Sequence, residues 1–425
     1  MTVEADDAQA QPSAPQRDEA TGDARAEGPA SGPAATEARL DAAWLTDPAA
    51  RQICAALEAG GARLYFVGGC VRNELLGLPV RDLDLATDAA PEEVQRLLDA
   101  AGIRHVPTGV EHGTVTAVLR NRGFEITTFR RDVVTDGRHA EVAFGASLEE
   151  DAARRDFTMN ALYAAPDGAL LDPVGQGLAD LRARRVRFIG DADARIAEDR
   201  LRILRFFRFH ALYGDPWRGI DADGLAACAA AAEGVEDLAR ERIGAEMRKL
   251  LGAEDPGPAL CAMEATGVLA RVLPGANAAA VAPLVAMEAR LAPLPDWKRR
   301  LVMMGVSPEA ATEALRLSRA EQRALRAIRA ALHEDAPAAR TAYRHGAEAA
   351  RDAALLRAAA TGDPPPRALQ RDIARGATAT FPVGADDLIA RGMKPGPALG
   401  RRLAELEDAW VASDFALTRG AMLDG

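Results

Sequence analysis

The segment from Leu64 to Thr87 limits the possible folds more than any other part of the sequence. An apolar run ends in Gly68 and Gly69, and an amphipathic run follows at once, which predicts a strand, a tight turn and a helix. Glycines let the backbone approach a ligand closely, and the free N–H groups at a helix N-terminus attract anions. The segment therefore predicts an α/β unit with an anion site at its turn.

Two aspartates, Asp82 and Asp84, lie on a second strand predicted over residues 82–86. Because alternate residues of a strand share a face, Leu83 and Leu85 should enter the core while both carboxylates face the glycine turn. Paired carboxylates are suitable ligands for Mg²⁺, and a bound triphosphate would supply further oxygens. Two such ions would activate an attacking hydroxyl and stabilise a leaving pyrophosphate. Two solvated acids on an edge strand are the alternative, which the rarity of Asp in strands disfavours.

The pattern of apolar residues changes along the chain. Residues 1–40 hold eight acids, three arginines and almost no large apolar side chains, so a disordered acidic tail is predicted. Helix and strand patterns then alternate, with strands at 115–119 and 124–129 joined by a turn at 121–123. Beyond residue 196 the pattern is helical almost without interruption. The chain is expected to have an α/β head with a small mixed or antiparallel sheet, followed by a long helical part.

Composition excludes several classes of protein. No apolar run reaches ~18 residues, so no membrane-spanning helix is predicted. The four cysteines are far apart and form no CxxC pair, which favours a reducing cytoplasm over a disulfide scaffold or a cysteine zinc site. The net charge of -11 disfavours a uniformly basic nucleic-acid binder. Residues 182–208 nevertheless hold nine arginines against four acids, which indicates a local basic cluster.

Three further motifs follow the glycine turn and the aspartate pair. Residues 154–162 read RRDFTMNAL, residues 197–214 begin AEDRLR, and residues 238–251 contain ERIGAE. Together with GGCVR and DLD, these motifs resemble the nucleotidyltransferases of the DNA polymerase β superfamily. More narrowly, the chain resembles the class II tRNA CCA-adding enzymes and their bacterial poly(A) polymerase relatives, from about Leu64 to Leu273.

The resemblance implies an α+β architecture. A polymerase-β-like nucleotidyltransferase head with a small mixed sheet is expected over residues 41–185. A helical neck with the base-reading and RNA-binding segment is expected over residues 186–275, and a helical body and tail over residues 276–425. The resemblance also implies Mg²⁺ as cofactor, the tRNA 3′ end, ATP and CTP as partners, and a cytoplasmic location; no protein partner is evident.

In the family, the RRDFTMNAL motif holds the nucleotide ribose, which implies this role for Arg155, Asp156 and Asn160. A carboxylate accepts a hydrogen bond from a 2′-hydroxyl, so Asp156 would favour ribonucleotides. The resemblance further assigns nucleotide binding to the glycine turn, Gly68 and Gly69, and to the arginine that follows it, Arg72.

Base selection is expected from Glu198, Asp199 and Arg202. Asp199 and Arg202 share a face of one predicted helix over residues 197–214. Cytosine and adenine each present an amino donor beside a ring-nitrogen acceptor, so a carboxylate next to a guanidinium matches them and mismatches uracil and guanine. Glu198 is four residues before Arg202 and should pair with it. A surface ion-pair network is the alternative interpretation. Arg205 and Arg208 follow Arg202 at steps of three residues and form a row of guanidinium groups with it. Arg205 and Arg208 are predicted to bind triphosphate or RNA backbone.

Other positions carry narrower predictions. Asn73 stands where the family usually has Asp, so it can hydrogen-bond Arg72 but cannot neutralise it. Glu125 is interpreted as a solvent-facing strand residue, with a third active-site acid as the alternative. Glu241 and Arg242 are interpreted as structural.

Addition of CCA to tRNA is the leading functional hypothesis. A poly(A) polymerase, or a partial enzyme that adds only CC or only A, is the alternative among enzymes. Residues 108–115 resemble the CCA-adding pattern more than the basic segment that is usual in poly(A) polymerases. From another class of protein, the alternative is a catalytically inactive RNA-binding protein, which the intact glycine turn and aspartate pair argue against.

Overall fold

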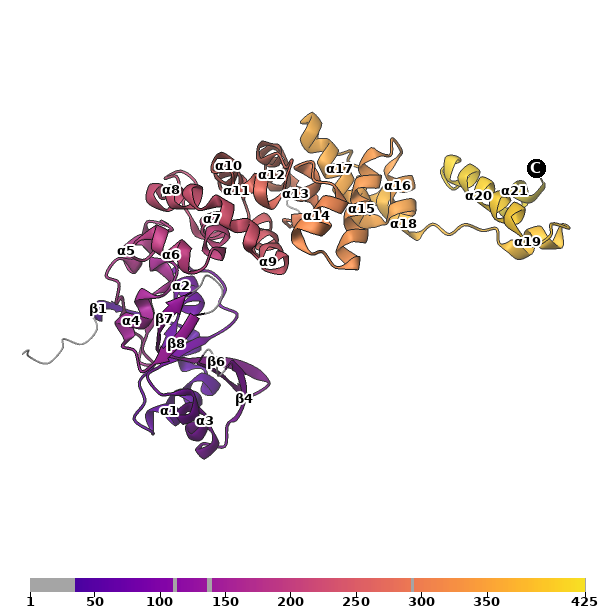
Figure 1. Cartoon of the computed structure of the whole chain (residues 1–425). Helices are drawn as coiled ribbons and strands as arrows, with labels where there is room; N and C mark the ends of the chain where they lie inside the picture. The colour runs from indigo at the N-terminus through magenta and orange to yellow at the C-terminus, as the bar shows by residue number, and fades with distance from the viewer. Residues whose placement is uncertain (1–34, 110–112, 136–139, 292–293, 425) are drawn as a thin grey trace, which may run out of the picture.

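The computed structural model describes residues 35–109, 113–135, 140–291 and 294–424. A head that contains the β-sheet lies at one end, and the helices that follow extend from it as an elongated arm (Figure 1). The predicted α+β architecture is confirmed. Part of the segment that resembles the CCA-adding pattern, residues 110–112, lies outside the described residues.

The head is built on an eight-stranded mixed sheet within the described residues. In spatial order its strands are β1 (Ala35–Arg39), β10 (Ala169–Leu171), β9 (Tyr163–Ala164), β2 (Leu64–Val67), β3 (Asp84–Thr87), β6 (Arg122–Thr128), β5 (Thr114–Leu119) and β4 (Arg104–Gly109). Strands β3 and β6 run parallel, and the other neighbouring pairs run antiparallel. A separate hairpin consists of β7 (Arg130–Thr135) and β8 (Ala140–Phe144).

The hairpin of β5 and β6 closes one residue earlier than predicted. Leu119 pairs with Arg122, so the loop consists of Arg120 and Asn121. Both loop residues have positive φ, of 52° and 60°, which is the backbone of the two-residue turn that matches strand twist.

Strand β1 corrects the predicted extent of the acidic tail. Ala35 pairs with Leu171 and Arg39 with Ala169, so residues 35–39 form an edge strand and not a disordered segment. An edge strand is held by backbone hydrogen bonds, which need no apolar side chains. The remainder of the predicted tail, residues 1–34, lies outside the described residues.

The head and the start of the arm contain short helices. They are α1 (Pro48–Glu58), α2 (Gly69–Leu75), α3 (Pro91–Ala100), α4 (Leu148–Ala153), α5 (Gly177–Arg182), α6 (Ala192–Glu198), α7 (Leu201–Tyr213), α8 (Ala222–Ala230), α9 (Arg240–Leu251), α10 (Gly257–Ala265) and α11 (Val268–Val272). Short 3₁₀ helices occupy Ala43–Thr46, Thr158–Asn160, Ala232–Asp237 and Ala278–Ala280.

The rest of the arm is helical to its end. Its helices are α12 (Val281–Leu291), α13 (Trp297–Met303), α14 (Pro308–Leu315), α15 (Arg319–His333), α16 (Ala338–His345), α17 (Ala347–Thr361), α18 (Leu369–Thr378), α19 (Ala385–Ala390), α20 (Pro397–Ala412) and α21 (Arg419–Asp424). One apolar core runs from the head to α17, and a second surrounds Trp410 in the C-terminal helices. No helix within the described ranges is long and apolar enough to cross a membrane.

The predicted helix over residues 197–214 is two helices, which is a correction. Helix α6 ends at Glu198, Asp199 has extended backbone (φ -148°, ψ 105°), and α7 begins at Leu201. At this break the Asp199 carboxylate accepts a hydrogen bond from the Leu201 N–H at 3.0 Å, which satisfies one of the free N–H groups at the start of α7.

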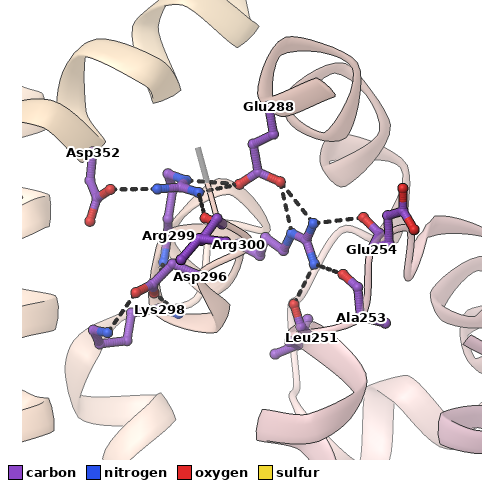
Figure 2. A network of polar contacts seen from close by, with 10 residues as sticks. Leu251, Ala253, Glu254, Glu288, Asp296, Lys298, Arg299, Arg300 and Asp352 are labelled. Atoms are coloured by element: carbon purple, nitrogen blue, oxygen red, sulfur yellow. Dashed lines mark hydrogen bonds and ion pairs between the residues drawn. The ribbon is translucent and has the colours of Figure 1, made fainter. Parts of the chain in front are cut away.

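Arg300 of α13 is fully buried where the end of α9 meets the body helices (Figure 2). Its guanidinium donates to the carbonyl oxygens of Leu251 at 2.6 Å and Glu254 at 2.9 Å, and also to that of Ala253. It also pairs with the Glu288 carboxylate of α12, at 2.8 Å. A single cation therefore satisfies three carbonyl oxygens at and beyond the end of α9.

The neighbouring Arg299 extends this network to a third helix. Its guanidinium donates to the second oxygen of Glu288 at 2.9 Å and to Asp352 of α17 at 2.7 Å (Figure 2). Glu288 thus neutralises two buried arginines at once. These ion pairs hold α12, α13 and α17 together in the apolar interior of the arm.

Candidate active site

One of the two aspartates, Asp84, lies beside the glycine turn. Antiparallel pairing of β2 with β3 places the end of β2, which leads into Gly68, beside the start of β3 at Asp84. Gly68 has φ 71°, a backbone conformation that favours glycine. Leu83 and Leu85 are buried in the core, as the predicted alternation requires, while Asp84 is half-buried and Asp82 exposed. The strand begins at Asp84, so Asp82 precedes it and does not lie on it.

Negative charge is concentrated around Asp84. Its pKa is raised, first by burial and then by the nearby carboxylate of Glu125, while Arg155 opposes the shift and Asp82 adds to it. Glu125 is the residue paired with Asp84 across the parallel strands β3 and β6, and its side chain is exposed. A divalent cation bound beside Asp84 would relieve this repulsion, and carboxylate oxygens are ligands that Mg²⁺ prefers. Within the described ranges, no group of three or more His, Cys, Asp or Glu side chains is arranged to hold a metal ion.

Arg155 lies beside the glycine turn and is held by two buried partners. One of its terminal nitrogens is 3.8 Å from the position that a Cβ atom would take at Gly68. The guanidinium donates to the Tyr163 hydroxyl at 2.9 Å and to the Asp151 carboxylate at 3.0 Å. Burial would raise the pKa of Asp151, but Arg155 and Arg154 outweigh it and lower the pKa to about 2. Sequence reasoning missed Asp151 and Tyr163.

Asp156 is buried with donors on both carboxylate oxygens. Arg205 of α7 donates to Oδ2 at 2.8 Å, and Asn160 and the Phe157 N–H donate to Oδ1 at 2.9 and 2.8 Å. Burial would raise the pKa of Asp156, but the Arg205 charge and these hydrogen bonds lower it. The structure therefore brings together three residues of the predicted site, Asp156, Asn160 and Arg205.

Arg72 of α2 lies between the head and the arm. It donates to Asn73 Oδ1 at 2.9 Å and to Asn160 Oδ1 at 2.6 Å. It also donates to the Tyr213 hydroxyl at 2.9 Å, with its guanidinium carbon 4.1 Å from the centre of that ring. Sequence reasoning missed Tyr213, although a tyrosine in the apolar pattern of a helix indicates a hydroxyl that needs a partner.

Asp199 and Arg202 have separate partners. Arg202 pairs with Glu198, as predicted, and donates to the carbonyl oxygens of Arg195 at 2.8 Å and Arg154 at 3.0 Å. Asp199 instead accepts from Arg242 of α9, at 2.8 Å. Arg242, interpreted from the sequence as structural, therefore pairs with one of the predicted base-selecting residues.

The other predicted nucleotide-binding arginines also have carboxylate partners. Arg205 pairs with Asp156, and Arg208 is buried against Glu246 of α9. Contact of these two arginines with triphosphate or RNA backbone stays a prediction. Glu246 was missed, because its motif indicated only a helical core segment.

A glycine turn, an aspartate pair at the start of the neighbouring strand and a helical arm together are typical of a nucleotidyltransferase with an RNA-binding extension. Residues 64–187 match the family profile of the poly(A) polymerase head domain. Residues 219–280 match a second profile, the probable RNA and SrmB-binding site of polymerase A.

Relatives narrow this class to one family. The CCA-adding enzyme of Limosilactobacillus fermentum is 34% identical over 385 residues, covering 86% of this chain and 93% of the relative. The chain therefore belongs to the CCA-adding enzyme family. The mitochondrial CCA tRNA nucleotidyltransferase 1 of Mus musculus is 45% identical over 189 residues. This match spans 44% of this chain and 43% of that relative, which is less than half of either protein.

A solved structure also resembles the whole architecture. The CCA-adding enzyme of Bacillus stearothermophilus in complex with CTP is 28% identical and has a TM-score of 0.71. The comparison covers 87% of this chain and 94% of that chain.

Proposed function

We propose that this chain adds C, C and A to the 3′ end of tRNA from CTP and ATP without a nucleic-acid template. The observation that carries the proposal is Asp84 beside the glycine turn, with Asp82 two residues before it, in a chain that matches nearly the full length of a bacterial CCA-adding enzyme. The 3′-hydroxyl of the RNA attacks the α-phosphate of the nucleotide, and pyrophosphate leaves.

The head residues bind and orient the triphosphate in this proposal. Gly68 and Gly69 allow close approach of the phosphates, and Arg72 and Arg155 carry positive charge beside that turn. Asp82 and Asp84 would hold Mg²⁺, which when bound would favour ionisation of the attacking hydroxyl and neutralise the leaving pyrophosphate.

The RRDFTMNAL segment and α7 complete the nucleotide site. Asp156 and Asn160 would lie against the ribose, where the Asp156 carboxylate can accept from the 2′-hydroxyl if it exchanges one of its present donors. Asp199 and Arg202 would read the base edge, Asp199 as acceptor and Arg202 as donor. Glu198 and Arg242 would orient these two side chains.

A test of base selection distinguishes a residue that contacts the base from one that only stabilises the fold. Asp199→Ala should weaken use of CTP and ATP and raise relative acceptance of UTP or GTP, by about ten- to hundredfold in discrimination, because a site acceptor is lost. Incorporation of each of the four nucleotides and the melting temperature should be measured together. Asp193→Ala, an exposed acid on α6, is the matched control. An equal loss for all four nucleotides in a destabilised protein would contradict the base-reading role.

Product sequencing distinguishes the alternatives. tRNA lacking its 3′ CCA, incubated with Mg²⁺ and mixed nucleotides, should gain C, C and A and then stop. A long run of A would indicate a poly(A) polymerase, and a product ending in CC, or in A added only to a CC end, a partial enzyme. No incorporation would leave the inactive RNA-binding protein.

A further inference from the structure

Arg72 differs from the other predicted nucleotide-binding arginines. Each of the others pairs with a carboxylate: Arg155 with Asp151, Arg202 with Glu198, Arg205 with Asp156 and Arg208 with Glu246. Arg72 forms no ion pair with Asp or Glu in the part of the chain that the structure describes, although it is buried. Its donors instead meet neutral oxygens, so no carboxylate fixes the orientation of its guanidinium.

The neutral contacts make the orientation of Arg72 depend on several residues. A hydrogen bond from a guanidinium to a neutral oxygen is weaker than one to a carboxylate. Asn73 offers one amide oxygen to two guanidinium nitrogens, at 2.9 and 3.2 Å. Asn160 offers another, and its amide group donates in turn to Asp156.

Tyr213 contributes two contacts at once. Its hydroxyl accepts from Arg72 at 2.9 Å, and its ring lies 4.1 Å from the guanidinium carbon, within the range of a cation–π interaction. Phe209, one turn earlier on α7, contacts both the Tyr213 ring and the guanidinium. Tyr213 is the last residue of the helix that carries Arg202 and Arg205.

We propose that Tyr213 is a positioning residue for nucleotide addition, which holds the Arg72 guanidinium toward the glycine turn where the incoming triphosphate binds. This inference rests on the proposed function. It assigns to the arm a part in binding phosphate at the head, in addition to the base-selecting residues on the same stretch of chain.

The test separates substrate binding from catalysis. Tyr213→Leu removes the hydroxyl and the ring and should raise KM for ATP and CTP about tenfold, with kcat changed less than about twofold, because the lost contact orients a group that binds substrate. Tyr213→Phe keeps the ring and should raise KM by about threefold. Tyr343→Phe, which loses a hydroxyl bond to Glu407 far along the arm, is the matched control and should keep the wild-type KM.

Rescue decides whether the effect passes through Arg72. Asn73→Asp would give the Arg72 guanidinium a charged partner that orients it. Adding Asn73→Asp to Tyr213→Leu should therefore lower the raised KM most of the way back to the wild-type value. A raised KM without rescue, or a lowered melting temperature with unchanged KM, would overturn the proposal. If the wild-type protein incorporates no nucleotide, the proposed function fails. The positioning role is then decided by calorimetric ATP binding, which Tyr213→Leu must weaken if the role is to stand.

Discussion

Asp84→Asn is expected to reduce nucleotide addition by about a thousandfold or more, while tRNA binding is retained. The change removes a charged ligand from the aspartate pair and so removes transition-state stabilisation of several kcal/mol. Addition of the first C to truncated tRNA in single turnovers, together with a tRNA binding assay, measures both effects. Asp99→Asn, an exposed acid on α3, is the control and should behave as wild type.

The same variant is expected to lose activity without losing folding stability at neutral pH. Because the folded protein raises the pKa of Asp84 above its unfolded value, this group favours folding most when protonated. The contribution of Asp84 to stability falls as the pH rises from 3.8, the pKa of this carboxyl in the unfolded chain, through its higher pKa in the folded protein. At neutral pH the charged form of Asp84 therefore disfavours folding.

Melting curves with and without Mg²⁺ follow from this sign. Without the ion, Asp84→Asn should melt at or above the wild-type temperature at pH 7. Added Mg²⁺ should raise the melting temperature of the wild type more than that of the variant. Near-normal turnover in Asp84→Asn, or an equal Mg²⁺ shift in both proteins, would remove Asp84 from the site.

Glu288→Gln is expected to destabilise the protein by about 3–5 kcal/mol, because it leaves two buried arginines without their shared carboxylate. Denaturant unfolding followed by circular dichroism measures the loss. Glu309→Gln breaks an exposed pair with Arg326 and is the matched control, with little change expected. Equal midpoints for the two variants would show that the network contributes no more than a surface pair.

Local sequence patterns were sufficient to predict much of the structure of the head. The apolar residues Leu83 and Leu85 fix which side of the strand Asp84 takes, because alternation along a strand depends only on neighbouring residues. The glycine turn follows from the same local information. The break at Asp199 was missed, although Asp is a poor residue for a helix interior because its carboxylate bonds to nearby backbone N–H groups, as it does here to Leu201.

Contacts across long sequence separations could not be predicted. Asp156 and Arg205 are 49 residues apart, and they meet only because α7 docks against the head. Each residue alone is compatible with a ribose contact, a phosphate contact or a surface pair. The partners of Asp199 and Arg208 lie on α9 for the same reason, since packing of two helices decides which charges are neutralised.

Arg300 gives the arm an order of assembly. Synthesis completes α9 at residue 251, but the side chain that donates to the carbonyl oxygens of Leu251 and Glu254 is made only when the ribosome reaches residue 300. Until then those oxygens must be hydrated, so the C-terminal end of α9 cannot reach its final buried position during the intervening synthesis. A nascent or truncated chain that stops between Glu254 and Arg300 therefore ends with this junction open, whatever the state of its head.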